Sequence, residues 1–128
     1  MKPLLLILLL CLPVRSLTAA QSQVILVLGD SLSSSYGLDA ERGWVHLLEE
    51  RLEERAYAYR VVNLSISGET TRAALAVLEP ALLKYRPGVV IIELGGNDGL
   101  RGIGLDEMRN NLTRLVAASR GQIGRAHV

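Results

Sequence analysis

The stretch Val24-Ile25-Leu26-Val27-Leu28-Gly29-Asp30-Ser31-Leu32-Ser33 decides the fold of this 128-residue chain. Its first half is a continuous apolar run, which is typical of a strand buried on both faces of a parallel sheet. The run ends in a glycine, an aspartate and a serine. Parallel α/β sheets bind their ligands at the carboxyl ends of the strands. The sequence therefore predicts a buried strand, 23–28, that presents Ser31 to a pocket.

Two further segments repeat this arrangement. Residues 60–64 and 89–94 are rich in apolar residues and we predict them to be strands, and polar, glycine-containing sequence follows each of them. These following segments are Ser65-Ile66-Ser67-Gly68-Glu69-Thr70 and Gly95-Gly96-Asn97-Asp98. All three polar segments thus come directly after a predicted strand, and this position favours one shared site.

Segments whose apolar residues recur at helical spacing separate the predicted strands. It predicts helices over 43–55, over 70–78 and over 105–119, with Pro80 either kinking the second helix or starting a new turn that resumes through Lys84. The apolar residues of these helices are Trp44, Leu47, Leu48 and Leu52, then Ala73, Ala74 and Leu78, then Met108, Leu112, Leu115 and Val116. Alternating strands and helices indicate an α/β fold, in which right-handed βαβ units build a parallel sheet.

The chain has the length of one domain, which we place at 21–121. We interpret residues 1–20 as a secretory signal peptide, because a basic start precedes a short apolar run and small residues at Ala19 and Ala20. A buried N-terminal helix is the alternative. The last residues, 122–128, resemble a translated sequencing adapter, and we expect a non-native tail there; a natural short C-terminus is the alternative.

Charge and cysteine content exclude several functions. Without the leader the chain has 12 basic and 13 acidic residues and no basic run, so we expect no nucleic-acid partner. Cys11 is the only cysteine and lies in the leader, which excludes disulfides and cysteine-ligated metal from the remaining chain. That remainder has no sustained apolar span, so we expect no stable membrane span.

The three polar segments carry the residue types of acyl-transfer chemistry. Ser31 offers a hydroxyl nucleophile, which needs a base to accept its proton. Gly68 lacks a Cβ, so its backbone N–H can approach a developing oxyanion, and the Asn97 side-chain amide can donate to the same oxygen. Taken singly, each residue could instead belong to an ordinary turn or helix cap. For Asp98 we favour a structural role over that of a catalytic acid.

These segments resemble the three conserved blocks of the SGNH (GDSL) hydrolase family, especially its bacterial periplasmic thioesterase, lysophospholipase and arylesterase branch. The resemblance spans roughly residues 22–120, with the blocks in order. It implies a flavodoxin-like three-layer α/β/α fold, truncated here after the third strand–helix unit. The matching blocks are Val27 to Ser33, Ser65 to Thr70 and Glu93 to Gly102.

The resemblance also implies site roles. Ser31 would be the nucleophile, and the Ser31 and Gly68 backbone N–H groups with the Asn97 side chain would form the oxyanion hole. The reaction would hydrolyse acyl esters or thioesters through an acyl-serine, with no metal or organic cofactor. Implied substrates include aryl esters and lysophospholipids, and the implied location is the periplasm.

One part of the family pattern is missing, because this sequence contains no Asp-x-x-His that would supply the catalytic acid and base. We assign neither His46, in a predicted amphipathic helix, nor His127, in the suspected tail, to catalysis. We therefore expect this chain to be inactive by itself, and strand 89–94 to form an exposed, aggregation-prone edge. Two other functions stay open at this point: a carbohydrate O-acetyl esterase, and a non-catalytic domain that binds phosphate or another ligand.

Overall fold

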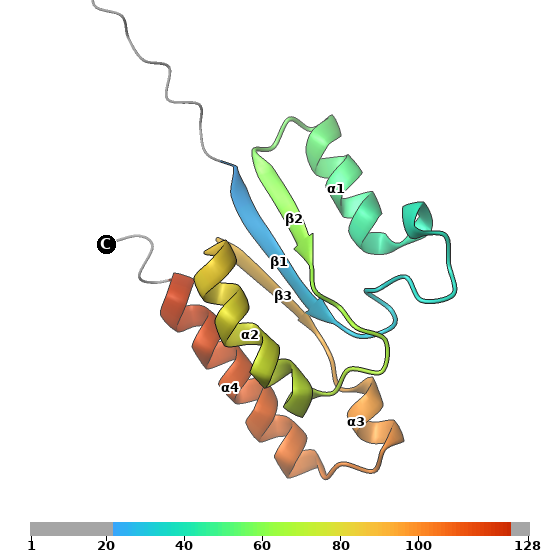
Figure 1. Cartoon of the computed structure of the whole chain (residues 1–128), viewed down its shortest axis with the longest axis vertical. Helices are drawn as coiled ribbons and strands as arrows, with labels where there is room; N and C mark the ends of the chain where they lie inside the picture. The colour runs from blue at the N-terminus through green and yellow to red at the C-terminus, as the bar shows by residue number, and fades with distance from the viewer. Residues whose placement is uncertain (1–21, 124–128) are drawn as a thin grey trace, which may run out of the picture.

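The apolar run after residue 22 forms the central strand of a parallel sheet, as the computed structural model of the chain shows over its described part, residues 22–123. This strand, β1 (Gln23–Gly29), lies between β2 (Tyr59–Asn63) and β3 (Val89–Glu93), in the order β2-β1-β3 (Figure 1). Residues 24–29 of β1 are buried, because strands flank it on both sides and helices cover it. The predicted parallel α/β fold is confirmed.

Helices connect and cover these strands. They are η1 (Ala40–Arg42), α1 (Trp44–Glu54), α2 (Thr71–Tyr85), α3 (Gly96–Leu100) and α4 (Leu105–Ile123). Figure 1 shows α2 and α4 side by side along the sheet, whereas α1 lies apart from them, against β2. The predicted strands agree with the observed ones to within one residue at each end, while η1 and α3 were not predicted.

The hydrophobic core lies between β1 and the α2–α4 pair. Leu26 and Leu28 on β1, Leu78 on α2 and Leu115 on α4 are at most 1% exposed. Burying each such side chain contributes roughly 1.5–3 kcal/mol. Because strand residues on both sides of Leu26 are also buried, β1 cannot move relative to the helices without disrupting this core.

Helix α2 excludes one of the two alternatives predicted at Pro80, the start of a new turn. The helix runs without interruption from Thr71 to Tyr85. Proline removes one N–H donor to the carbonyl four residues earlier, here that of Ala76, and both residues are exposed, so that carbonyl can face solvent. The Thr70 hydroxyl caps this helix, because it accepts a hydrogen bond of 3.3 Å from the Ala73 N–H.

The apolar faces of α1 and α4 also differ from the prediction. In α1, Val45 is the buried residue, whereas Leu47 is 52% exposed. In α4, Leu115 is fully buried against α2, but Val116 is 40% exposed. The helix continues past Ser119, where the predicted helix ends, to Ile123.

The expected signal peptide, 1–20, lies outside the described residues, as does most of the expected tail. Within residues 22–123, no helix combines the length and apolar character needed to cross a membrane. Strand β3 forms one edge of the three-stranded sheet, as predicted for strand 89–94.

Candidate functional site

The parallel register brings the three polar segments to one edge of the sheet. Gly29 pairs with Glu93, so β1 and β3 end at the same level, and Val27 pairs with Asn63, so β2 ends two residues earlier at the same edge. The backbone N–H of Ile66 also donates to the Gly29 carbonyl at 3.1 Å. The segment after β2 is thereby attached to the start of the segment after β1.

Asn97 joins all three segments through its side chain. Its Nδ2 donates to the Glu69 carbonyl at 2.9 Å and to Asp30 Oδ2 at 3.2 Å. Asp30 is 4% exposed, and its other carboxylate oxygen accepts the Leu32 N–H at 3.0 Å. One amide group therefore contacts the neighbours in sequence of both Ser31 and Gly68.

Ser31 lies in a tight turn directly after Asp30. The Ser34 N–H donates to the Asp30 carbonyl at 2.9 Å and the Tyr36 N–H to the Ser31 carbonyl at 3.2 Å, so successive turns follow the serine, not a helix. Ser31 is half-buried, whereas Ser33, two residues later, is fully buried. Of these two hydroxyls, only that of Ser31 can meet a substrate.

Gly68 adopts a backbone conformation that favours glycine, with φ of +81°. Its carbonyl accepts a hydrogen bond of 2.8 Å from Arg101 Nη2. A Cβ at Gly68 would lie 3.4 Å from the same guanidinium nitrogen, an ordinary van der Waals contact, so the backbone conformation is what favours glycine here. The Gly68 carbonyl is thus held by the side chain of Arg101, the residue that follows α3.

Asp98 has the structural position that the sequence suggested. Its carboxylate is fully buried and accepts from the Thr71 N–H at 2.9 Å and from Thr71 Oγ1 at 2.5 Å. Asn111 on α4 donates to the same Thr71 hydroxyl at 3.1 Å. Because this carboxylate receives the first N–H of α2, it anchors α3, and with it Asn97, to the head of that helix.

Sequence reasoning missed four residues that hold the turn around Ser31: Asp30, Ser33, Asn63 and Glu93. Asn63 Nδ2 donates to the Ser33 carbonyl at 2.8 Å, and Asn63 Oδ1 accepts the Ser65 N–H at 3.1 Å. The Ser33 hydroxyl donates to Glu93 Oε2 at 2.9 Å. Polar residues at strand ends were the available signal, but nothing in the sequence pairs them.

The two histidines lie elsewhere. His46 is on α1 with a side chain that is 40% exposed, and its Nε2 lies 3.5 Å from Glu50 Oε1, one helical turn away. This agrees with the predicted helix-surface position. His127 lies outside the described residues.

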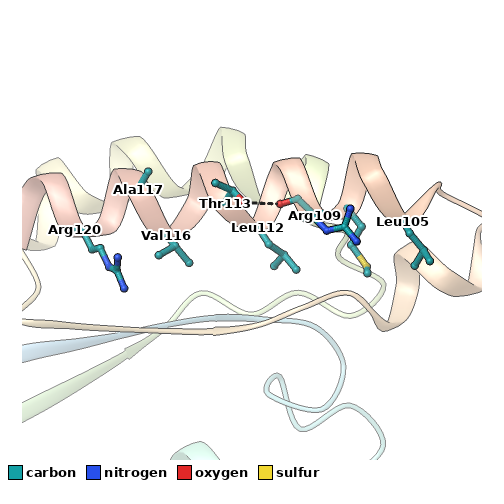
Figure 2. Close-up of a pocket in the computed structure, with 8 residues that line it drawn as sticks. Leu105, Arg109, Leu112, Thr113, Val116, Ala117 and Arg120 are labelled. Carbon is teal, nitrogen blue, oxygen red and sulfur yellow. Dashed lines mark hydrogen bonds between the residues drawn. The ribbon is translucent and has the colours of Figure 1, made fainter.

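An apolar hollow of about 680 Å³ runs along α4, and its lining residues all belong to that helix. Figure 2 shows Leu112 and Val116 pointing from α4 toward the sheet, with Arg109 and Arg120 beside them. The hollow contains no residue of the three polar segments. The site around Asn97 is therefore separate from this hollow.

The chain is similar to known hydrolases over most of its length. A family model described as the GDSL-like Lipase/Acylhydrolase family matches residues 27–128. The chain is 47% identical over 113 residues to the esterase TesA of Pseudomonas aeruginosa, covering 88% of this chain and 56% of that protein. It is 43% identical over 99 residues to thioesterase 1/protease 1/lysophospholipase L1 of Escherichia coli K12, covering 77% and 46%.

Solved structures show the same likeness. The crystal structure of TesA superposes with a TM-score of 0.77 at 48% identity, covering 79% of this chain and 56% of that one. A psychrotrophic esterase, EstA, from Pseudoalteromonas sp. gives a TM-score of 0.75 at 46% identity, covering 79% and 55%. The chain thus spans about half the length of the relatives it matches.

Proposed function

Because the chain belongs to the GDSL-like lipase/acylhydrolase family, we propose that it carries the nucleophile and the oxyanion-binding groups of a serine hydrolase that cleaves acyl esters or thioesters. The observation that supports this most directly is the position of Asn97. Its amide contacts both Asp30, beside Ser31, and Glu69, beside Gly68. A carbonyl carbon next to Ser31 would therefore have its oxygen near donors from all three segments.

The proposed reaction proceeds in two steps. Ser31 Oγ attacks the carbonyl carbon and passes its proton to a base, the carbonyl oxygen becomes an oxyanion, and the alcohol or thiol leaves with a proton. Water then attacks the acyl-serine and releases the acid. The sequence has no Asp-x-x-His, so we propose that residues of a chain of the relatives' full length supply the base.

Three donors stabilise the oxyanion in this proposal: the backbone N–H groups of Ser31 and Gly68, and Asn97 Nδ2. Both Asn97 amide hydrogens already have acceptors, and the bond to Asp30 is the longer, at 3.2 Å against 2.9 Å. We expect that longer bond to be shared with the oxyanion, because charge there develops only in the transition state. Asp30 would keep the amide oriented between turnovers.

The substrate class follows from the relatives. Those described above are named as an esterase and as a thioesterase, protease and lysophospholipase, and a protein of Vibrio mimicus that is 42% identical over 102 residues is named an arylesterase. We propose small acyl esters and thioesters as substrates, lysophospholipids among them. Residues 1–20 would direct the protein across the inner membrane to the periplasm. Residues 122–128 would be a non-native tail, although α4 continues through its first two residues, Gln122 and Ile123.

A chimera tests the proposal. Residues 22–120 of this chain replace the matching part of the P. aeruginosa esterase TesA, and hydrolysis of a short p-nitrophenyl ester is followed. We expect turnover, and we expect Ser31→Ala to lower kcat by at least about 10⁴-fold, since a serine hydrolase without its nucleophile keeps only residual catalysis.

Ser22→Ala is the matched control, because this exposed serine lies at the opposite end of β1. It should leave kcat unchanged. Turnover that persists in the folded Ser31→Ala chimera would show that Ser31 is not the nucleophile.

A further inference from the structure

The fully buried Ser33 hydroxyl links three parts of the molecule. It donates to Glu93 Oε2 at 2.9 Å, at the end of β3, and it accepts a hydrogen bond of 3.2 Å from Trp44 Nε1, at the start of α1. A hydroxyl has one hydrogen to donate, and Glu93 receives it. The orientation of this side chain is therefore fixed from two sides.

Gly29 leaves the space that this arrangement needs. A Cβ at Gly29 would lie 2.6 Å from Ser33 Oγ, which is too close for a carbon atom, and 3.1 Å from Glu93 Oε2, which is a tight contact. The turn thus folds the Ser33 side chain back over the end of its own strand. A hydroxyl buried there without partners would be unfavourable, so Glu93 and Trp44 specify one position for it.

The backbone of Ser33 is held as well. Asn63 Nδ2 donates to its carbonyl at 2.8 Å, and the Ser34 N–H closes the turn onto the Asp30 carbonyl at 2.9 Å. Asp30 itself accepts from Asn97. Ser31 therefore lies between two residues that other segments hold in place: Asp30, contacted by Asn97 on α3, and Ser33, contacted by Asn63 on β2 and Glu93 on β3.

We propose that Glu93 is a positioning residue for Ser31, acting through the Ser33 hydroxyl; this inference rests on the function proposed above. Glu93 contacts Ser33, so it holds the turn and takes no proton from the nucleophile. A misplacement of about 1 Å at a reacting group costs on the order of 10² in rate. Loss of Glu93 should therefore lower kcat and leave KM nearly unchanged.

The kinetic test uses the TesA chimera with Glu93→Ala, Glu93→Gln and Ser33→Ala. We expect Glu93→Ala to lower kcat by about 10- to 100-fold with KM within about twofold. Glu93→Gln should recover most of the loss, because its amide oxygen can still accept from Ser33. Glu93→Ala combined with Ser33→Ala should be no worse than either change alone, since the two residues act as one unit. Glu79→Ala, an exposed glutamate on α2, is the control.

The outcomes separate this inference from the proposed function. If Ser31→Ala abolishes turnover but Glu93→Ala stays within twofold of the parent, the positioning role is wrong and the serine assignment stands. Equal inactivity of Glu93→Ala and Glu93→Gln would also overturn it, because the carboxylate charge itself would then be needed. Persistent turnover in Ser31→Ala would remove the premise of both.

Trp44 provides a second readout that needs no activity, because it is the only tryptophan of the chain. In the 128-residue protein, Glu93→Ala should increase acrylamide quenching of Trp44 fluorescence, while Glu93→Gln should leave quenching at the parent level. Trp44→Phe removes the indole donor and leaves Glu93 in place, so in the chimera it should lower kcat less than Glu93→Ala does. Unchanged quenching in Glu93→Ala would show that the three residues do not act together.

Discussion

Replacing Asp98 by alanine should destabilise the domain strongly, although Asp98 is not assigned to catalysis. Its buried carboxylate accepts two hydrogen bonds from Thr71, at 2.9 Å from the N–H and at 2.5 Å from Oγ1. Hydrogen bonds to a charged group contribute about 1.5–3 kcal/mol each. Removing the carboxylate also relieves the cost of burying its charge, so the net loss is smaller than the sum. We expect about 3 kcal/mol lower free energy of unfolding.

A double-mutant cycle with Thr71→Val isolates this contact. Valine keeps the shape of threonine and removes only the hydroxyl, which also bonds to Asn111. The two changes share a hydrogen bond, so we expect a coupling energy of about 1 kcal/mol or more. Urea unfolding of the TesA chimera, followed by far-UV circular dichroism, measures all four proteins.

Asp106→Ala is the matched control, since its side chain is 97% exposed and forms only a surface ion pair with Arg109 at 2.8 Å. Surface pairs contribute little, so this substitution should not change unfolding measurably. The reasoning fails if Asp98→Ala unfolds at the same urea concentration as the Asp106 variant. It also fails if Asp98 and Thr71 show no coupling.

Two further predictions concern Asn97 and Gly68, the proposed oxyanion donors, and both use the TesA chimera and the p-nitrophenyl ester. Asn97→Ala should lower kcat by about 10²–10³-fold. The control is Asn110→Ala, a change at an exposed asparagine on α4 that should leave kcat unchanged. If the two variants have the same kcat, Asn97 does not belong to the oxyanion hole. Gly68→Ala should lower kcat more than tenfold, roughly the effect expected from disturbing one donor. Gly37→Ala is the control, because Gly37 has a similar φ of +78° but open space around it. If Gly37→Ala lowers kcat as much as Gly68→Ala does, the cause is general backbone strain and not a lost oxyanion donor.

Much of the fold can be predicted from the sequence because each strand is rich in apolar residues and a polar, glycine-containing segment follows it. The same feature predicts that Ser31, Gly68 and Asn97 lie near one another, since parallel strands end at a common edge. Helix α3 could not be predicted. Its segment contains Gly96 and Gly99, and glycine disfavours a helix by about 1 kcal/mol per residue. The helix exists because Asn97 and Asp98 bind partners in other segments.

The contacts that hold the turn around Ser31 could not be predicted from the sequence either. Ser33 and Glu93 are 60 residues apart, and their contact depends on the register that places Gly29 opposite Glu93. Trp44 looks like one member of an apolar helix face, yet its indole nitrogen is what contacts Ser33. Such contacts follow from three-dimensional register, which residue type and spacing along the chain do not reveal.

The central place of β1 has a consequence for biosynthesis. Gln23 pairs with Tyr59, and Ile25 pairs with Val89, so the first strand to leave the ribosome receives its two neighbours one after the other, and late. Until Val89–Glu93 has emerged, the nascent polypeptide exposes one side of its most apolar strand. Pairing over such long separations is slow, and unpaired strands are prone to stick to other chains. We therefore expect newly made protein to depend on a holding chaperone until β3 is available.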